Sequence, residues 1–316
     1  MHRAAASPFR RLAVLSGGFA TVSAVSIQKQ PSIHCARCSS TRSTRPAPLS
    51  VIDQHTIWCL DFDGVICNSA NETGTAGWKC CDKLWSEHDN WAKVPKQEVL
   101  AQFCKVRPVL ESGWEAILLV RMLATGQADV QTLLDSFQSG MKENEMKKLE
   151  LTEEGLVLEF NTMRKTWISE DEAGWLNSNT FYPEAVEAAR DLVSQNKDVY
   201  IITTKAAGFT RQLLKRAGIA IPEEKIFGQG SGKKWATIQN VLAQPGRHPD
   251  SRVFFLEDRL KALEEVQEQT ALVPKVVLAL ADWGYCMPEA VQVAKDTGMT
   301  ILNLQAFRDL CSGKKN

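Results

Sequence analysis

Five short apolar runs, each followed by polar residues, predict the strands of a sheet. Each run has strand length rather than helix length. Helical patterns alternate with these runs, and buried strands that alternate with helices predict an α/β fold with a Rossmann-like, doubly wound parallel sheet. Such sheets bind ligands at the carboxyl ends of their strands. The predicted strands are 56–60, 199–202, 253–256, 276–280 and 300–302, and the helices lie near 183–194, 208–217, 234–243, 259–269 and 287–296.

The stretch between Ser69 and about Thr180 breaks this alternation, because it contains no convincing strand pattern. Apolar side chains within 118–123 recur at the spacing of an amphipathic helix. Six of the nine tryptophans lie in this stretch, and we expect them to pack in a core rather than to stack on a planar substrate. The expected division is a core of 51–69 and 181–316 with a helical insertion at 70–180, whose helices lie near 96–105, 109–124, 129–138 and 153–168.

Two pairs of acidic residues follow predicted strands. Asp61 and Asp63 end the first run, and Glu257 with Asp258 ends the run at 253–256. Carboxylates at one strand end repel each other and need a cation or a shared proton. Because neighbouring parallel strands end at the same edge of a sheet, three or four carboxylates would converge there, and oxygen ligands of this kind suit Mg²⁺. The alternative interpretation is a set of solvated turn residues.

Two further segments carry groups that can hold an anion. Thr203 and Thr204 follow the second predicted strand, where a hydroxyl and backbone N–H groups can bind a phosphate oxygen. The glycine-rich segment 228–234 precedes a helix and brings a lysine to its start. It is not a P-loop, because a tryptophan follows the second lysine where Ser or Thr is required. Lys233 and Lys234 are both candidates for this lysine.

This ordered set of motifs resembles that of the haloacid dehalogenase-like superfamily of phosphohydrolases. The superfamily's four motifs are similar, in order along the chain, to 61–65, Thr203, Lys234 and the pair Glu257 and Asp258. The insertion after the first motif matches the superfamily's helical cap of the first type (C1). Segments 107–115 and 282–285 are similar to a plant, algal and cyanobacterial subfamily for which we know no assigned substrate.

The resemblance implies a role for each of these residues. Asp61 is the expected nucleophile, which attacks phosphorus and becomes an aspartyl phosphate, and Asp63 is the expected acid and base. Thr203 and Lys234 are expected to bind the phosphoryl oxygens. The implied Mg²⁺ ligands are Asp61, the backbone carbonyl of Asp63, and Asp258, with Glu257 acting through water. The remaining substrate contacts are assigned to Thr204 and to the cap, where Arg107, Glu111, Arg121 and Lys142 are the candidates.

The predicted function is that of a Mg²⁺-dependent phosphatase acting on a phosphate monoester of a small metabolite. A phosphomutase of the same superfamily is the first alternative, and a non-catalytic regulatory or binding protein with this fold is the second. The second acid, Asp63, favours ester hydrolysis or mutase chemistry over dehalogenation. The inserted helices count against a protein phosphatase, which usually has an open site.

Charge is distributed unevenly along the 316 residues. The 37 Lys+Arg and 37 Asp+Glu give a formal net charge of zero, but the first acidic residue is Asp53 and seven cations precede it. This Arg- and Ser-rich start predicts a transit peptide over 1–50, directed to the chloroplast or alternatively to the mitochondrial matrix. A secretory signal and a disordered tail are the other interpretations. The remainder is mildly acidic, so we expect no nucleic-acid partner, and no apolar run is long enough for a membrane helix.

The nine cysteines are odd in number and scattered along the chain. The adjacent Cys80 and Cys81 are the arrangement that most suggests redox chemistry. We expect both to be reduced packing residues instead.

Overall fold

The computed structural model describes residues 45–85, 87 and 91–312. Within these residues, six parallel strands form one sheet in the order β5-β4-β1-β6-β7-β8. The first strand of the chain therefore lies inside the sheet, with a later strand on each side of it. The strands are β1 (Thr56–Leu60), β4 (Asp198–Ile202), β5 (Ile226–Phe227), β6 (Arg252–Glu257), β7 (Val276–Ala281) and β8 (Thr300–Leu302). The predicted α/β fold with a parallel sheet is confirmed.

Helices cover both faces of the sheet, as expected for a doubly wound fold. Side chains alternate along β1, so that Trp58 and Leu60 face one helical layer while Ile57 and Cys59 face the other. The first layer contains α7 (Pro183–Ser194), α8 (Ala207–Arg216) and α12 (Leu304–Cys311), and the second contains α9 (Lys234–Leu242), α10 (Leu260–Gln267) and α11 (Pro288–Asp296). Because both faces are buried, the central strands are apolar at nearly every position.

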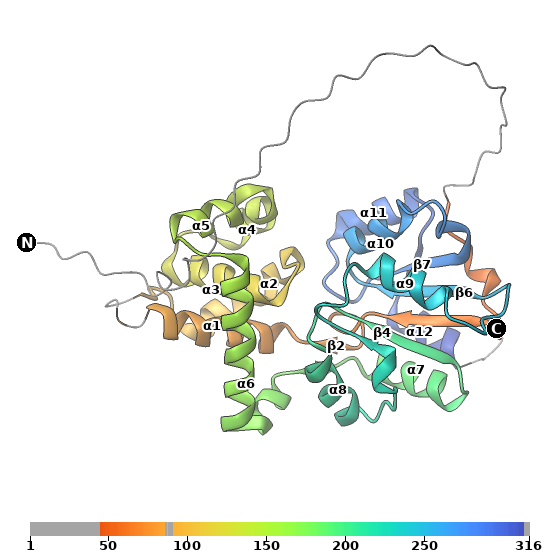
Figure 1. Ribbon diagram of the computed structural model, residues 1–316. Helices are drawn as coiled ribbons and strands as arrows, with labels where there is room; N and C mark the ends of the chain where they lie inside the picture. Colours follow the sequence, from red (N-terminus) through yellow and green to blue (C-terminus); the bar gives the residue numbers. More distant parts are fainter. Residues whose placement is uncertain (1–44, 86, 88–90, 313–316) are drawn as a thin grey trace, which may run out of the picture.

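A helical insertion follows β1. The chain leaves through β2 (Cys67–Asn68) and returns through β3 (Thr180–Phe181), and these two short strands pair antiparallel. Between them lies a separate group of helices beside the sheet (Figure 1). They are α1 (Ala70–Trp85), α2 (Lys96–Val106), α3 (Ala116–Thr125), α4 (Val130–Ser136), α5 (Lys142–Lys148) and α6 (Glu153–Asn177). Shorter helical turns are η1 (Leu49–Val51), η2 (Arg107–Val109), η3 (Gly113–Glu115), η4 (Phe137–Met141), η5 (Glu223–Lys225) and η6 (Val273–Lys275). The predicted helical insertion after the first strand is therefore present.

Some elements differ from the sequence pattern. The helix expected over 109–124 begins only at Ala116, because Ser112 and Glu115 form a capping box that starts a new helical segment. Helix α6 continues beyond its expected end, with non-helical backbone angles at Asp171. Helices α1, α5 and α12 and the two-residue strand β5 are additional to the predicted elements.

Most of the predicted transit peptide, residues 1–44, lies outside the described residues. Its last part, residues 45–50, contacts the folded core. The Ala47 N–H donates to the Val276 carbonyl at 3.0 Å, and Pro46 is buried. The folded part of the chain therefore begins before residue 51. Within the described residues, no helix is both long and apolar enough to cross a membrane.

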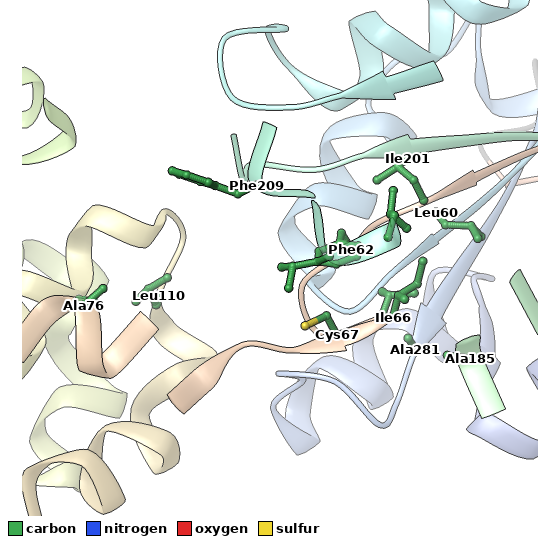
Figure 2. Packing of buried hydrophobic residues seen from close by; sticks show 14 of the residues in the cluster. Leu60, Phe62, Ile66, Cys67, Ala76, Leu110, Ala185, Ile201, Phe209 and Ala281 are labelled. Carbon is green, nitrogen blue, oxygen red and sulfur yellow. The ribbon is translucent and has the colours of Figure 1, made fainter. Parts of the chain in front are cut away.

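One apolar cluster runs through the core and the cap. Figure 2 shows Phe62, just beyond the end of β1, and Ala76 and Leu110 on the cap, which belong to the same buried cluster. The cap therefore packs onto the core and is not held by its two linkers alone. Cys80 and Cys81 belong to the same cluster, and burial raises the pKa of both thiols, as expected for packing residues.

A buried carboxylate in the cap links two cap helices to the core. Glu72 of α1 is fully buried, and Arg164 of α6 donates to both of its oxygens, from Nε at 2.6 Å and from Nη2 at 2.5 Å. Trp175 Nε1 donates to Glu72 at 3.0 Å, and Nζ of Lys205, which follows β4, lies 3.6 Å from it. Burial raises the pKa of Glu72, but Arg164 and Lys205 outweigh burial and lower the pKa to about 2. Glu72 is therefore ionised in the folded protein.

Replacing Glu72 with Gln is expected to destabilise the protein by about 3–5 kcal/mol, because it leaves two buried cations with one anion fewer. Urea denaturation near neutral pH, followed by tryptophan fluorescence, measures the free energy of unfolding. Glu143→Gln is the matched control, since the Glu143 side chain is 60% exposed and its ion pair with Lys142 spans 3.6 Å. A loss below about 1 kcal/mol for Glu72→Gln would contradict the role given to this carboxylate.

Candidate active site

Three carboxylates meet at the carboxyl ends of two neighbouring strands. Asp61 directly follows β1, Glu257 is the last residue of β6, and Asp258 follows it. Strands β1 and β6 pair in parallel with Leu60 opposite Leu256, so their ends lie side by side. One oxygen of each of the three carboxylates lies within 4.8 Å of the others, and all three residues are buried. The structure thus brings together three of the four acids that the sequence placed at this edge.

Two glycines allow other parts of the chain to approach Asp258. Gly64 has a φ of +85°, and a Cβ there would lie 1.9 Å from Asp258 Oδ2. A Cβ at Gly284 would lie 2.4 Å from the Cβ of Asp258. The backbone N–H of Tyr285 donates to Asp258 Oδ2 at 2.7 Å. The turn after β1 and the loop after β7 therefore fix the position of this carboxylate. Both can approach it only because a glycine, which has no side chain, stands at the point of contact.

Of the two candidate lysines, Lys234 belongs to the acidic cluster. It is the first residue of α9, and its Nζ lies 2.9 Å from Asp61 Oδ1 and 2.6 Å from Glu257 Oε2. Lys233 precedes the helix, and its Nζ pairs with Glu265 at 2.9 Å near the surface. The structure therefore identifies Lys234, rather than Lys233, as the lysine of the acidic cluster, because the two side chains leave the start of α9 in different directions.

Burial and mutual repulsion oppose the ionisation of the clustered acids. Burial and Glu257 raise the pKa of Asp61 to about 7, although Lys234 counteracts them. Burial, followed by Asp61, raises the pKa of Asp258, and burial also raises the pKa of Glu257. Burial lowers the pKa of Lys234, but Asp61 and Glu257 outweigh burial and raise it, so the lysine stays charged. One lysine cannot neutralise three carboxylates, so the cluster has a deficit of positive charge.

The cluster fits a divalent cation such as Mg²⁺. Asp258 Oδ1 is buried and has no hydrogen-bond partner among the described residues, which is costly for a carboxylate oxygen. Hard cations prefer oxygen ligands of this kind. Glu257 is already engaged, since its oxygens accept from Lys234 Nζ at 2.6 Å and from the Arg259 N–H at 3.2 Å. Asp61 and Asp258 are therefore the side chains best placed for direct contact with a cation.

Asp63 has a different partner from the three clustered acids. Its Oδ1 lies 3.3 Å from the Nζ of Lys205, whose side chain is 1% exposed and also lies near Glu72. Sequence reasoning assigned no role to Lys205 or Glu72, because their pairing depends on where the cap lies. The one available signal was the position of Lys205 directly after Thr203 and Thr204 at a strand end.

The two threonines after β4 have different surroundings. Thr203 is buried, its hydroxyl accepts the Lys205 N–H at 3.1 Å, and its own N–H donates to the Phe227 carbonyl at 2.9 Å. Thr204 is exposed and lines the cavity next to Asp61. Thr203 lines a second cavity that adjoins the first. The side chain of Thr204 is therefore the more accessible of the two from the acidic cluster.

A cavity of about 210 Å³ lies between the core and the cap. Asp61 and Asp63 line it from the core, and Arg107 and Glu111 line it from the cap. The Glu111 carboxylate accepts from Lys261 Nζ of the core at 2.7 Å, so it holds the cap loop against the core. The two other cap candidates lie outside this lining and form pairs inside the cap, Arg121 with Glu145 at 2.6 Å and Lys142 with Glu115 at 2.9 Å.

Comparison with known proteins supports the fold. No family model matches the chain, and no curated protein matches its sequence. The structure is similar to a predicted phosphoglycolate phosphatase from Haemophilus somnus, with a TM-score of 0.51 and 15% identity over 84% of this chain and 100% of that one. It is equally similar to a protein provisionally assigned as a phosphatase from Clostridium difficile, with a TM-score of 0.51 and 13% identity over 81% of this chain and 97% of that one. At these identities the likeness shows the fold alone, an α/β fold with a parallel sheet.

Asp61→Asn is expected to stabilise the metal-free protein on the alkaline side of pH 7. A carboxyl whose pKa rises from 3.8 to about 7 on folding holds its proton more tightly when folded, so stability falls as the pH rises between these values. The amide removes this cost and should raise the melting temperature by about 5 °C in EDTA at high pH, with little change near about pH 4.

Differential scanning fluorimetry at both pH values measures this difference. Asp250→Asn is the control, because the Asp250 side chain is 79% exposed. A lower melting temperature for Asp61→Asn than for the wild type at high pH would contradict the repulsion described for this cluster.

Proposed function

We propose that this protein is a phosphatase that hydrolyses a small phosphate monoester with the help of a bound Mg²⁺. The observation that carries the proposal is the surroundings of Asp61. This carboxylate ends a central strand, has Lys234 Nζ 2.9 Å from its Oδ1, and lines a cavity together with a second acid, Asp63. A carboxylate placed in this way can act as a nucleophile towards phosphorus. The phosphatase names of the similar structures agree with the proposal.

The proposed reaction has two steps. A carboxylate oxygen of Asp61 attacks phosphorus, the bond between phosphorus and the ester oxygen breaks, and Asp63 gives its proton to that leaving oxygen. A water molecule then attacks the phosphorus of the aspartyl phosphate, and Asp63 takes up a proton from this water. The bond between phosphorus and the Asp61 oxygen breaks, which frees the Asp61 carboxylate, and inorganic phosphate leaves. Lys205, with its Nζ 3.3 Å from Asp63 Oδ1, holds this carboxylate in position for both steps.

The surrounding residues provide binding and charge. Lys234 offsets the charge of Asp61 and can bind a phosphoryl oxygen, as can the hydroxyl and N–H groups of Thr203 and Thr204. A bound Mg²⁺ would reduce the repulsion between Asp61 and the phosphoryl group and stabilise the transferred oxygens. Asp61 and Asp258, whose carboxylates belong to the acidic cluster with Glu257, would hold it. The resemblance described above adds the backbone carbonyl of Asp63 and a water-mediated contact from Glu257 to this proposed set.

Purified protein with Mg²⁺ is expected to release inorganic phosphate from at least one member of a panel of small phosphate monoesters. Asp61→Asn should lower the rate by about 10³-fold or more, because it removes the nucleophile, and EDTA should abolish turnover. A colorimetric phosphate assay measures this, with Asp250→Asn as the control for surface charge. Two results would contradict the proposal: no release from any substrate, or transfer between sugar phosphates without release, which would indicate a phosphomutase.

Asp63→Asn should separate the two steps. With p-nitrophenyl phosphate, the leaving group needs little protonation, so we expect one rapid equivalent of p-nitrophenol to survive the substitution. Steady-state turnover should fall by about 10²-fold or more, because no base activates the water that attacks the aspartyl phosphate. Stopped-flow absorbance records both phases. An equal loss of the burst and of the steady rate would show that Asp63 is not the acid and base.

We also propose, on sequence grounds alone, an address and a closer relationship. The N-terminal leader would direct the chain to the chloroplast, or else to the mitochondrial matrix. Segments 107–115 and 282–285 would place it with the plant, algal and cyanobacterial subfamily.

A further inference from the structure

Arg107 is a buried cation of the cap that lacks an acidic partner. It is 6% exposed, its Nη1 donates to the Leu110 carbonyl at 3.4 Å, and its Nε has no hydrogen-bond partner among the described residues. No carboxylate in the described part of the chain lies within 4.0 Å of its guanidinium nitrogens. A buried charge without a partner is costly, so its retention calls for a ligand.

Arg107 differs in this respect from the other cations around the cavity. Seven lysines and arginines of the described chain line it, and the other six each have an acid within ion-pair distance. The pairs are Arg164 with Glu72, Lys205 with Asp63, Lys233 with Glu265, Lys234 with Asp61, Arg259 with Glu111 and Lys261 with Glu111. The positive charge of Arg107 is thus the one in this lining that the fold itself leaves uncompensated at contact distance.

The position of Arg107 is fixed by a ring from the core. Its guanidinium carbon lies 3.9 Å from the centre of the Tyr285 ring. The Tyr285 hydroxyl accepts the Ser69 N–H at 2.8 Å and donates to Asn68 at 3.0 Å, so the ring cannot swing away freely. Stacking occupies the face of a guanidinium and leaves its edge available for a planar, bidentate contact with a carboxylate.

Arg107 faces the same small cavity as the acidic cluster, since Asp61, Asp258 and Lys234 line this cavity together with Arg107. Between them the lining includes apolar side chains, namely Leu110, Trp114, Val157 and Phe160. The cavity thus offers an anion site at the metal end, a short apolar wall, and a second cation in the cap.

We propose that Arg107 selects substrates that carry a carboxylate on the alcohol side of the phosphate ester, that is, small phosphorylated hydroxy acids. This inference rests on the proposed phosphatase function. The phosphoryl group would lie at Asp61 and Lys234, and the carboxylate would accept from the free edge of Arg107. A cavity of about 210 Å³ admits a short carbon chain between the two groups. Through Arg107, the cap would thereby recognise the charged group at the far end of the substrate.

Two substrates that differ at the end far from the phosphate test this selection. 2-Phosphoglycolate and ethyl phosphate have the same chain length, and only the first has the carboxylate. The wild type is expected to prefer 2-phosphoglycolate by about 10²-fold in kcat/KM. Arg107→Gln should lose about 10²- to 10³-fold on 2-phosphoglycolate, and this loss should be at least about 30-fold greater than its loss on ethyl phosphate.

Two further variants and a second pair of substrates complete the experiment. Arg107→Lys keeps the charge without the planar fork, so it should recover part of the preference, about 10-fold. Lys105→Gln removes an exposed charge from the end of α2, two residues before Arg107, and should behave like the wild type on both substrates. Propyl phosphate and 1,3-propanediol bisphosphate form a second pair, in which the far group is a phosphate. Melting temperatures show whether each variant is folded.

The outcomes separate the inference from the function on which it rests. Equal losses on both substrates for Arg107→Gln would overturn the inference, since Arg107 would then serve the acidic cluster or the transferred phosphoryl group. So would a wild type that hydrolyses other monoesters but shows no preference for 2-phosphoglycolate. A preference for the bisphosphate over propyl phosphate, without a preference for 2-phosphoglycolate, would also overturn the inference, because Arg107 would then recognise a second phosphate instead of a carboxylate. No turnover of any ester in the panel would overturn the phosphatase function, and the inference with it.

Discussion

The burial of several carboxylates at one edge of a sheet is the constraint on which the rest of the structure depends. Asp61, Glu257 and Asp258 lie together because β1 and β6 end side by side, and burial and repulsion oppose their ionisation. The two glycines beside Asp258 and the start of α9 keep these groups and Lys234 within contact distance. A single lysine leaves the cluster short of positive charge, and this deficit favours the binding of a metal ion.

Charge also joins the core to the cap. Lys205 has one acidic partner in the core, Asp63, and one in the cap, Glu72. In a second contact, Lys261 of the core pairs with Glu111 of the cap. Because Lys205 is buried and is satisfied from both sides, the position of the cap and the position of Asp63 are coupled. Packing of the cap against the core thus also fixes the Asp63 carboxylate through Lys205.

Burial determines how much of the fold the sequence predicts. The central strands are buried on both faces, so they appear as apolar runs, whereas β5 has only two residues and leaves no such run. Helix α1 contains two glycines, which lower helix propensity. They are nevertheless required, because a Cβ at Gly77 would lie 2.8 Å from the Ala116 carbonyl oxygen of α3. Close packing overrides propensity in the cap, and a single sequence does not reveal it.

The candidate site is predictable where a motif lies at one strand end, and not where a contact joins distant segments. Asp61 and Asp63 are visible as a pattern, but Arg107 and Glu111 are two charged residues among many. Charge alone does not separate them. In the structure Glu111 has two cations for partners, Arg259 and Lys261, whereas Arg107 has no acid among the described residues. The Glu111 carboxylate is therefore paired within the fold, whereas the Arg107 guanidinium is not. The absence of an acidic partner is visible only in the structure, and it is the reason for assigning Arg107 to a ligand.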